Sequence, residues 1–114
     1  MQIVNKKITL DELKKMSQKM FNQLVKAVVD IKNGIMVVDA GLHAEEEDLL
    51  LENGSEQQDL WGINLYPEKF GTDTFIEFDS LINIRPSWGN NSRSVENLEI
   101  QESIINTVNK LVMS

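Results

Sequence analysis

The chain has 114 residues, the size of one domain with its own hydrophobic core, and we expect a single globular domain over residues 1–114. Its 41% apolar and 25% charged residues exclude a disordered chain, and the absence of cysteine excludes disulfides, thiol nucleophiles and thiolate zinc sites. The net charge of −7 argues against nucleic acid as a partner, because an acidic surface repels phosphate backbones.

Charge is distributed unevenly along the chain. Residues 1–35 hold seven lysines and three acids, whereas residues 36–114 hold four basic and fifteen acidic side chains. A basic protein partner fits such a surface better than a polyanion does. The N-terminal residues lack an apolar signal segment, and the aliphatic runs are far shorter than the roughly 20 residues of a membrane span. We therefore expect no membrane association and a cytoplasmic location.

The N-terminal part predicts a strand followed by a helix. Residues 2–8 have the pattern of a short strand. Thr9 and Glu12 then form a capping box, which is a sequence signature of a helix start. Apolar residues recur at helical spacing from there as far as Leu24, so one stripe of this helix is expected to be buried.

A hairpin and a second helix are predicted next. The apolar period changes to two after Leu24, and Asn33-Gly34 separates two β-branched runs. This pattern predicts a hairpin over residues 25–40, because both residues of an Asn-Gly turn tolerate positive φ. Residues 43–54 predict a short helix, with acids in its first turn and a glycine at its end.

The remaining chain predicts two strands and a last helix. Residues 59–66 and 74–85 have strand patterns, Pro86 closes the second strand, and residues 96–112 have helical spacing. The element order is thus β-α-β-β-α-β-β-α. It indicates an α+β fold with a mostly antiparallel sheet and three helices packed mainly on one face.

Counting in steps of two along the last two strands separates polar from apolar residues. Ile76, Phe78, Ile82 and Ile84 fall on one face of the last strand, which we assign to the core. Antiparallel pairing is expected to gather the polar residues of both strands side by side, although an ordinary solvated sheet face is the simpler explanation for them. These polar residues are Asn64, Tyr66, Glu77, Asp79, Asn83 and Arg85.

Arg85 and Arg93 are the only arginines, and a Gly-Asn-rich loop at residues 89–93 lies next to them before the last helix. Arginine recognises carboxylate and phosphate groups with two hydrogen bonds, so our leading hypothesis is a binding domain for a small anionic ligand or a peptide carboxylate. Asn90 and Ser92 belong to the same candidate site, together with Asn64, Tyr66 and Asn83. The alternative is that the loop residues form turns and caps while both arginines pair with acids.

A hydrolase is the second hypothesis. Glu77 and Asp79 share one strand face, so they are candidate catalytic carboxylates, with His43 and a divalent cation as further candidates. His43 is followed by three glutamates, but a single histidine is a poor start for a zinc site, and we predict no metal site there. The sequence leaves any cofactor unknown. A purely structural or interaction role is the third hypothesis.

Large apolar residues raise the questions of core and assembly. We assign Trp61 to the core, and we consider Trp88 either a contact for a ligand or partner or a plug that closes its loop. Leu60, Phe75 and Leu81 fall on the face that is otherwise polar, where they would form an exposed patch suited to a twofold dimer. A covering helix or loop would remove this patch, and we favour a monomer over a homodimer.

Three stretches carry a resemblance to a known family: LHAEEE at 42–47, GSEQQDLWGINLYP at 54–67 and NIRPSWGNNSR at 83–93. They resemble a family of small prokaryotic proteins known only as a domain of unknown function. The resemblance covers nearly the whole chain and implies a solitary domain but no reaction. Trp88 departs from the family pattern, in which glutamine is common before Gly-Asn. The resemblance implies polar family positions at His43, Asp59, Asn64, Asn83, Arg85, Asn90, Ser92 and Arg93.

Overall fold

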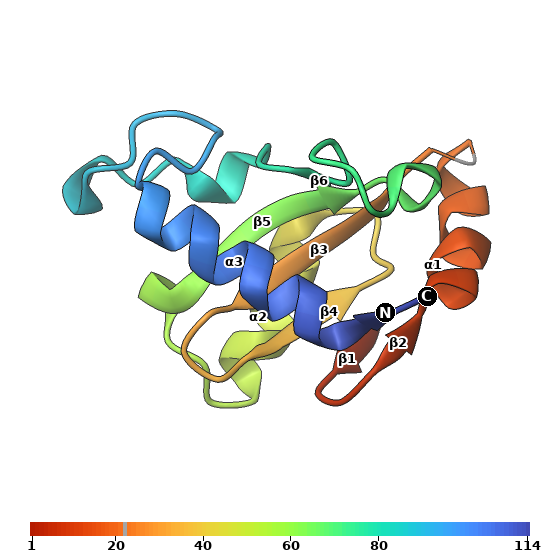
Figure 1. Ribbon diagram of the computed structural model, residues 1–114. Coiled ribbons are helices and arrows are strands. Elements are labelled where there is room, and N and C mark those ends of the chain that lie inside the picture. Colours follow the sequence, from red (N-terminus) through yellow and green to blue (C-terminus); the bar gives the residue numbers. More distant parts are fainter. Residues whose placement is uncertain (22) are drawn as a thin grey trace.

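A computed structural model describes residues 1–21 and 23–114 and contains three helices and a five-stranded antiparallel sheet (Figure 1). The predicted α+β fold is confirmed. In spatial order the strands are β1 (Gln2–Val4), β4 (Ile35–Val38), β3 (Val25–Asp30), β5 (Leu60–Leu65) and β6 (Ile76–Glu77). The helices are α1 (Leu10–Ser17), α2 (His43–Glu52) and α3 (Leu98–Leu111). A separate parallel pair joins β2 (Ile8–Thr9) to β7 (Val112–Met113).

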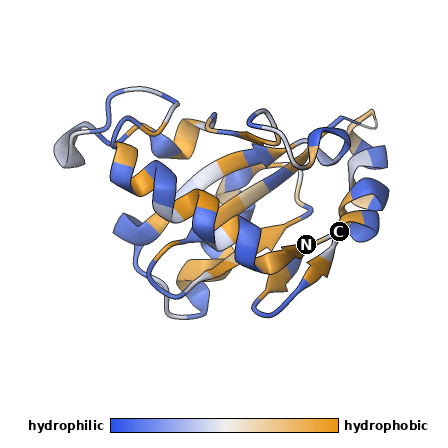
Figure 2. Ribbon diagram, viewed as in Figure 1, coloured by the Kyte–Doolittle hydropathy of each residue, from blue (hydrophilic) through white to orange (hydrophobic). Residues whose placement is uncertain are grey.

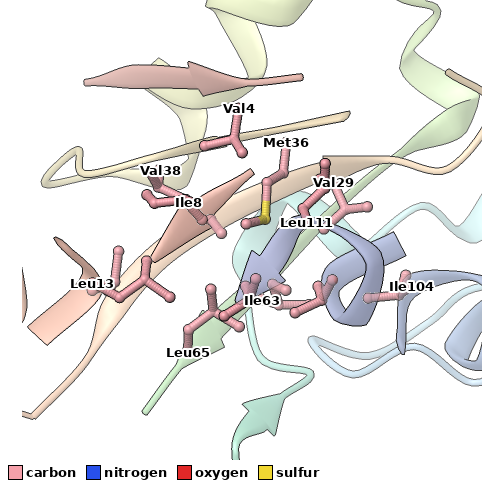
Figure 3. Packing of buried hydrophobic residues seen from close by; sticks show 14 of the residues in the cluster. Val4, Ile8, Leu13, Val29, Met36, Val38, Ile63, Leu65, Ile104 and Leu111 are labelled. Carbon is pink, nitrogen blue, oxygen red and sulfur yellow. The ribbon is translucent and has the colours of Figure 1, made fainter. Parts of the chain in front are cut away.

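Both faces of the sheet are covered. Helices α1 and α3 pack on one face, where the side chains in Figure 3 converge between sheet and helices, among them Leu13, Ile63 and Leu111. Helix α2 lies behind the sheet in Figure 1, and its Leu50 packs against Val28 on the opposite face. The expected arrangement of helices mainly on one face therefore holds for α1 and α3, whereas α2 departs from it.

The helices form where local sequence signals place their starts. The Oγ1 atom of Thr9 accepts the N–H of Glu12 at 3.1 Å, as the capping box predicts, and the Asn97 side chain accepts the N–H of Ile100 at 3.0 Å. Apolar and polar residues alternate along α3 with helical spacing, so that one side of it is hydrophobic (Figure 2). The first helix ends earlier than predicted. A short 3-10 turn at Gln18–Met20 follows α1, and Phe21 then takes the left-handed φ of 58° that stops the helix.

The predicted hairpin is confirmed, but its turn differs from the expected one. Strands β3 and β4 pair antiparallel, with Asp30 opposite Ile35. Only Gly34 has positive φ, at 67°, and Asn33 does not. The buried Asp30 carboxylate accepts the N–H groups of Lys32 and Asn33, both at 3.0 Å, so a longer loop wraps around this side chain.

Two predicted strands are shorter than expected. The stretch 2–8 divides, because after β1 the chain leaves the sheet and Ile8 pairs with Val112 instead. The stretch 74–85 is a strand only at Ile76–Glu77, and 3-10 turns follow at Leu81–Asn83 and Pro86–Trp88. The predicted alternation over 74–85 is therefore wrong beyond Asp79. Asn83 and Arg85 are buried, and Ile84, assigned to the core, is 42% exposed.

The side chain of Asn83 explains why the last strand stops. Its Oδ1 accepts the N–H of Gly62 at 2.8 Å and its Nδ2 donates to the Gly62 carbonyl at 2.9 Å, so one amide takes the place of a strand backbone along β5. The chain crosses β5 closely here. A Cβ atom on residue 62 would lie 2.5 Å from the Ser80 Cβ, which is closer than two carbon atoms can approach. This position therefore requires glycine.

The expected dimer patch does not form. Leu60 is fully buried under α2, and Phe75 is buried in the main core. Leu81 alone of the three is exposed, at 67%. None of the helices within residues 1–21 and 23–114 is long and apolar enough to cross a bilayer.

Candidate functional site

A pocket of about 560 Å³ opens on the α2 face of the sheet, between the start of α2, the β5–β6 pair and the end of the first helical segment. It brings together residues that the sequence singled out from three separate stretches of chain. The predicted site residues that line it are His43, Asn64, Tyr66, Glu77, Asp79 and Arg93. A smaller cavity of about 380 Å³ lies between residues 70–78 and α3, and none of the predicted site residues lines it.

The floor of the pocket is a row of three side chains on adjacent strands. Lys26 of β3 is the register partner of Asn64 of β5, and Asn64 is the partner of Glu77 of β6. Paired residues in a sheet project to the same face and neighbouring strands lie about 4.8 Å apart, so a cation, an amide and a carboxylate stand side by side. We call these three residues the polar row. Its lysine makes no hydrogen bond or ion pair with the described part of the chain.

Glu77 and Asn64 are held in fixed orientations. One carboxylate oxygen of Glu77, Oε1, accepts both the Asn64 Nδ2 at 2.8 Å and the Tyr66 hydroxyl at 2.9 Å. The Asn64 Oδ1 is buried and has no partner among residues 1–21 and 23–114. Burial raises the pKa of Tyr66, and the hydrogen bond to Glu77 and the charges of Glu77 and Asp79 raise it further.

His43, the first residue of α2, is fixed in one tautomer. Its Nε2 lies 2.8 Å from the Ile63 carbonyl oxygen, and because a carbonyl only accepts, this nitrogen carries the proton. Burial lowers the pKa of His43, and nearby Lys26 lowers it too, against the smaller opposing effects of the Ile63 carbonyl, Asp79 and Asn64. The ring is therefore neutral at neutral pH, with a lone pair on Nδ1.

The start of α2 also faces the pocket. Leu42 occupies the position before the helix and has no side-chain oxygen, so no side chain caps α2. The first turn of a helix leaves backbone N–H groups without helical partners, and these groups carry a partial positive charge. Leu42, His43 and Ala44 all line the pocket, so this end of the helix opens onto it.

Arg93 sits at the edge of the pocket and pairs with Asp79. Its Nε donates to the Asp79 Oδ1 at 2.6 Å, and both side chains remain partly exposed, at 55% and 41%. The guanidinium has further N–H donors besides Nε. Asp79 is thus neutralised by a residue of the site itself, and Arg93 retains donors for a ligand.

Arg85 has a different environment and does not line the pocket. Its Nη2 donates to the Glu47 Oε2 at 3.0 Å, and its guanidinium carbon lies 5.0 Å from the Trp61 ring centre and 5.4 Å from that of Trp88. Burial lowers the pKa of Arg85, and Glu47 opposes this effect. Trp61 is a core residue, as predicted, whereas Trp88 remains half exposed and covers Arg85.

Two asparagines complete this second group of polar residues. Besides its bonds to Gly62, Asn83 donates to the Arg93 carbonyl at 2.9 Å. Asn90 donates to the carbonyls of Asn83, at 2.8 Å, and Ser94, at 2.7 Å, and it closes a tight loop through backbone bonds with Arg85. Ser92 is exposed and lies outside the pocket. We call the group the arginine cluster, which comprises Glu47, Trp61, Asn83, Arg85, Trp88 and Asn90.

The acids after His43 do not form a metal site. Within residues 1–21 and 23–114, no group of three or more histidine and acidic side chains is arranged to hold a metal ion. Glu47 pairs with Arg85, and Glu46 is fully buried with its Oε2 3.2 Å from the N–H of Ala40. Burial raises the pKa of Glu46 to about 9, so it is protonated at neutral pH.

Sequence reasoning missed Lys26 and the open start of α2. Lys26 interrupts the apolar run of its strand, and that interruption was the available signal. Its position beside Asn64 depends on pairing between β3 and β5, which are separated by a hairpin and a helix. Local pattern does not specify such a register.

The comparisons with known proteins give a family but no activity. Residues 2–111 match a family model described as "Protein of unknown function (DUF5674)". No curated protein and no solved structure matches the chain. The resemblance seen in the sequence is therefore confirmed over nearly the whole chain, and function has to be inferred from the site.

Proposed function

From the geometry of its pocket, we propose that this chain, which belongs to the DUF5674 family of proteins of unknown function, binds a small ligand with an anionic group there. The anionic group is a carboxylate or a phosphate. One observation carries the proposal: the Lys26 ammonium, which has no partner among residues 1–21 and 23–114, lies in the same pocket as the uncapped start of α2.

Both features favour an anion for independent reasons. The N–H groups at a helix start point towards a bound anion, and the helix dipole favours negative charge at that end. Lys26 adds a full positive charge at a partly buried position, where its attraction is screened less than on an open surface. Arg93, whose guanidinium has donors besides the Nε bonded to Asp79, lines the same pocket.

Glu45 in the first turn of α2 opposes this preference, but the two acids that line the pocket, Asp79 and Glu77, do not cancel it. Asp79 is paired with Arg93, and Glu46 is protonated at neutral pH because it is buried. His43 is neutral and adds no charge. Glu77 lies at the far end of the polar row from Lys26, so the anionic group belongs at the lysine end.

The proposal moves the predicted anion site from the loop 89–93 to the pocket. Of the two arginines, only Arg93 is partly exposed beside the pocket, whereas Arg85 is enclosed by Glu47 and two tryptophans. Two guanidinium nitrogens of Arg85, Nε and Nη1, have no partner in the described residues, but both are buried, so they are not open to a ligand.

Ligand-observed NMR with inorganic phosphate, acetate and N-acetyl-leucine tests the proposal. We expect millimolar or tighter binding of at least one probe, and at least a tenfold weaker affinity in Lys26→Gln. Lys15→Gln is the matched control, since Lys15 is exposed on α1 and does not line the pocket. Equal affinities of the two variants would contradict the proposal, and the absence of binding by every probe would favour a structural or interaction role.

Acid–base catalysis in the same pocket is a second candidate function, favoured by the fixed tautomer of His43. The lone pair of Nδ1 accepts a proton from a water molecule while the water oxygen attacks an ester carbonyl, and Nδ1 then returns this proton to the alkoxide, which leaves as the alcohol. Hydrolysis of simple amino acid esters by the wild type, lost in His43→Gln with the fold intact, would support it. Equal turnover in both proteins would contradict it.

A further inference from the structure

The opposite end of the polar row points to a second charged group on the ligand. We infer that the ligand is a small zwitterion of the amino acid type, whose ammonium group binds Glu77 while its carboxylate binds Lys26 and the start of α2. This inference rests on the proposed function and adds the class of ligand.

The spacing of the row suits such a molecule. Two strand spacings separate Lys26 from Glu77, which places their backbones about 10 Å apart. Both side chains reach into the pocket from its floor, with Asn64 between them. In an amino acid the ammonium and the carboxylate are bonded to the same carbon atom, so a ligand placed between the two side chains directs one charge towards each.

Glu77 has no cationic partner in the described part of the chain. Both groups that donate to it, the Asn64 amide and the Tyr66 hydroxyl, are neutral, and both bind Oε1. Within residues 1–21 and 23–114 no lysine, arginine or histidine forms an ion pair with Glu77. Its Oε2 thus remains available as a charged acceptor on an exposed side chain.

Asn64 fixes the orientation of the carboxylate. Its Nδ2 donates to the Glu77 Oε1 at 2.8 Å and to the Asp79 carbonyl at 3.3 Å, and this fixes which end of the amide faces which way. Its own Oδ1 is buried, so the acceptor open to an ammonium is the Glu77 Oε2 on its exposed side chain.

The rim of the pocket indicates an apolar substituent on the ligand. Leu42 and Leu81 line the pocket and are 59% and 67% exposed, and Ile82 follows Leu81 along the chain and also lines it. An apolar side chain on the ligand would cover these residues and gain the free energy of their burial. Leucine therefore serves as the probe.

Three probes separate the contributions of the two charges. L-leucine carries both groups, N-acetyl-leucine keeps only the carboxylate, and leucinamide keeps only the ammonium. We expect L-leucine to bind at least tenfold more tightly than either analogue. In Glu77→Gln, affinity for L-leucine should fall to about that for N-acetyl-leucine. Affinity for N-acetyl-leucine should stay the same, because the amide oxygen of the substituted side chain still accepts from Asn64 and Tyr66.

The outcomes distinguish this inference from the proposed function. Equal affinities for L-leucine and N-acetyl-leucine would overturn the inference and leave carboxylate binding intact. Binding of leucinamide alone, or of none of the three together with no binding of inorganic phosphate or acetate, would overturn the proposed function as well. Glu99→Gln, an exposed change on α3 away from the pocket, is the control, and thermal melting of each variant verifies that it is folded.

Discussion

The arginine cluster and the pocket lie along the same strand, β5, and differ in how their polar groups are used. In the cluster, Arg85 Nη2 bonds to Glu47 and the Asn83 amide bonds to the backbone of Gly62, while Arg85 Nε and Nη1 are buried without partners in the described residues. The pocket begins two residues after Gly62, at Asn64, where the Lys26 ammonium and the Glu77 Oε2 lack protein partners in the described chain on side chains that solvent reaches. Residue type shows what a group can bind, whereas its accessibility decides whether a ligand reaches it.

Burial sets the two regions apart energetically. The side chains of Arg85 and Glu47 are only 7% and 11% exposed, so each charge depends on the other for its stability. Lys26 and Glu77 retain access to solvent and do not depend on a protein partner. Changes in the arginine cluster should therefore alter folding stability, and changes in the pocket should alter binding.

Arg85→Met should have the largest effect on stability. The change leaves the buried Glu47 carboxylate without its cation and should lower the free energy of unfolding by about 3–5 kcal/mol, measured by urea denaturation. The double variant Arg85→Met with Glu47→Met should recover much of this loss, because no charge is then buried alone. A loss below about 1 kcal/mol in the single variant would show that the arginine is not held as described.

Asn83→Ala should cost about 3 kcal/mol, because it leaves the N–H and carbonyl of Gly62 and the carbonyl of Arg93 without their bonds. The matched control is Asn91→Ala in the neighbouring loop, where the side chain is exposed and a change within about 0.5 kcal/mol is expected. Urea denaturation of both variants provides the comparison. Similar values for the two would contradict the role of the Asn83 amide as a substitute for a strand.

Glu46→Gln should stabilise the protein. Removal of the neighbouring Glu47 carboxylate, which pairs with Arg85, should instead destabilise it. The folded pKa of Glu46, about 9, lies above its ordinary value of 4.5, so its stability contribution is complete below pH 4.5 and lost as pH rises towards 9. The variant should gain roughly 2–3 kcal/mol at pH 7, with little difference at pH 4. Denaturation at both pH values measures this, and a pH-independent difference would refute it.

Lys26→Gln should have the smallest effect on stability, within about 0.5 kcal/mol, because the ammonium has no partner in the described chain to lose. Thermal melting of this variant beside wild type provides the measurement. A loss of more than about 2 kcal/mol would place Lys26 with the arginine cluster as a structural residue.

The parts of the fold that the sequence predicted are those with local causes. The capping residue Thr9, the hairpin at Gly34 and the helical spacing of 98–111 act over a few residues, and all three appear in the structure. The end of the last strand has a non-local cause, because the competing amide of Asn83 binds a glycine 21 positions away. No pattern within 74–85 contains that information.

The same distinction applies to the site. Pairing of the stretches 59–66 and 74–85 was expected to gather Asn64, Tyr66 and Glu77, and they do meet, because the register there agrees with the pattern. Arg85 was grouped with Arg93 from closeness in sequence. Its partner Glu47 lies 38 positions away on α2, where the sequence shows only one acid among several.

A residue-resolved NMR titration of the wild type with L-leucine tests the central claim that the pocket, and not the arginine cluster, is the site available to a ligand. We predict that the largest amide shifts occur at Lys26, His43 and Ala44 and in the side-chain amide of Asn64, with small shifts over residues 85–92. The largest shifts over residues 85–92, with the four pocket signals unmoved, would contradict it.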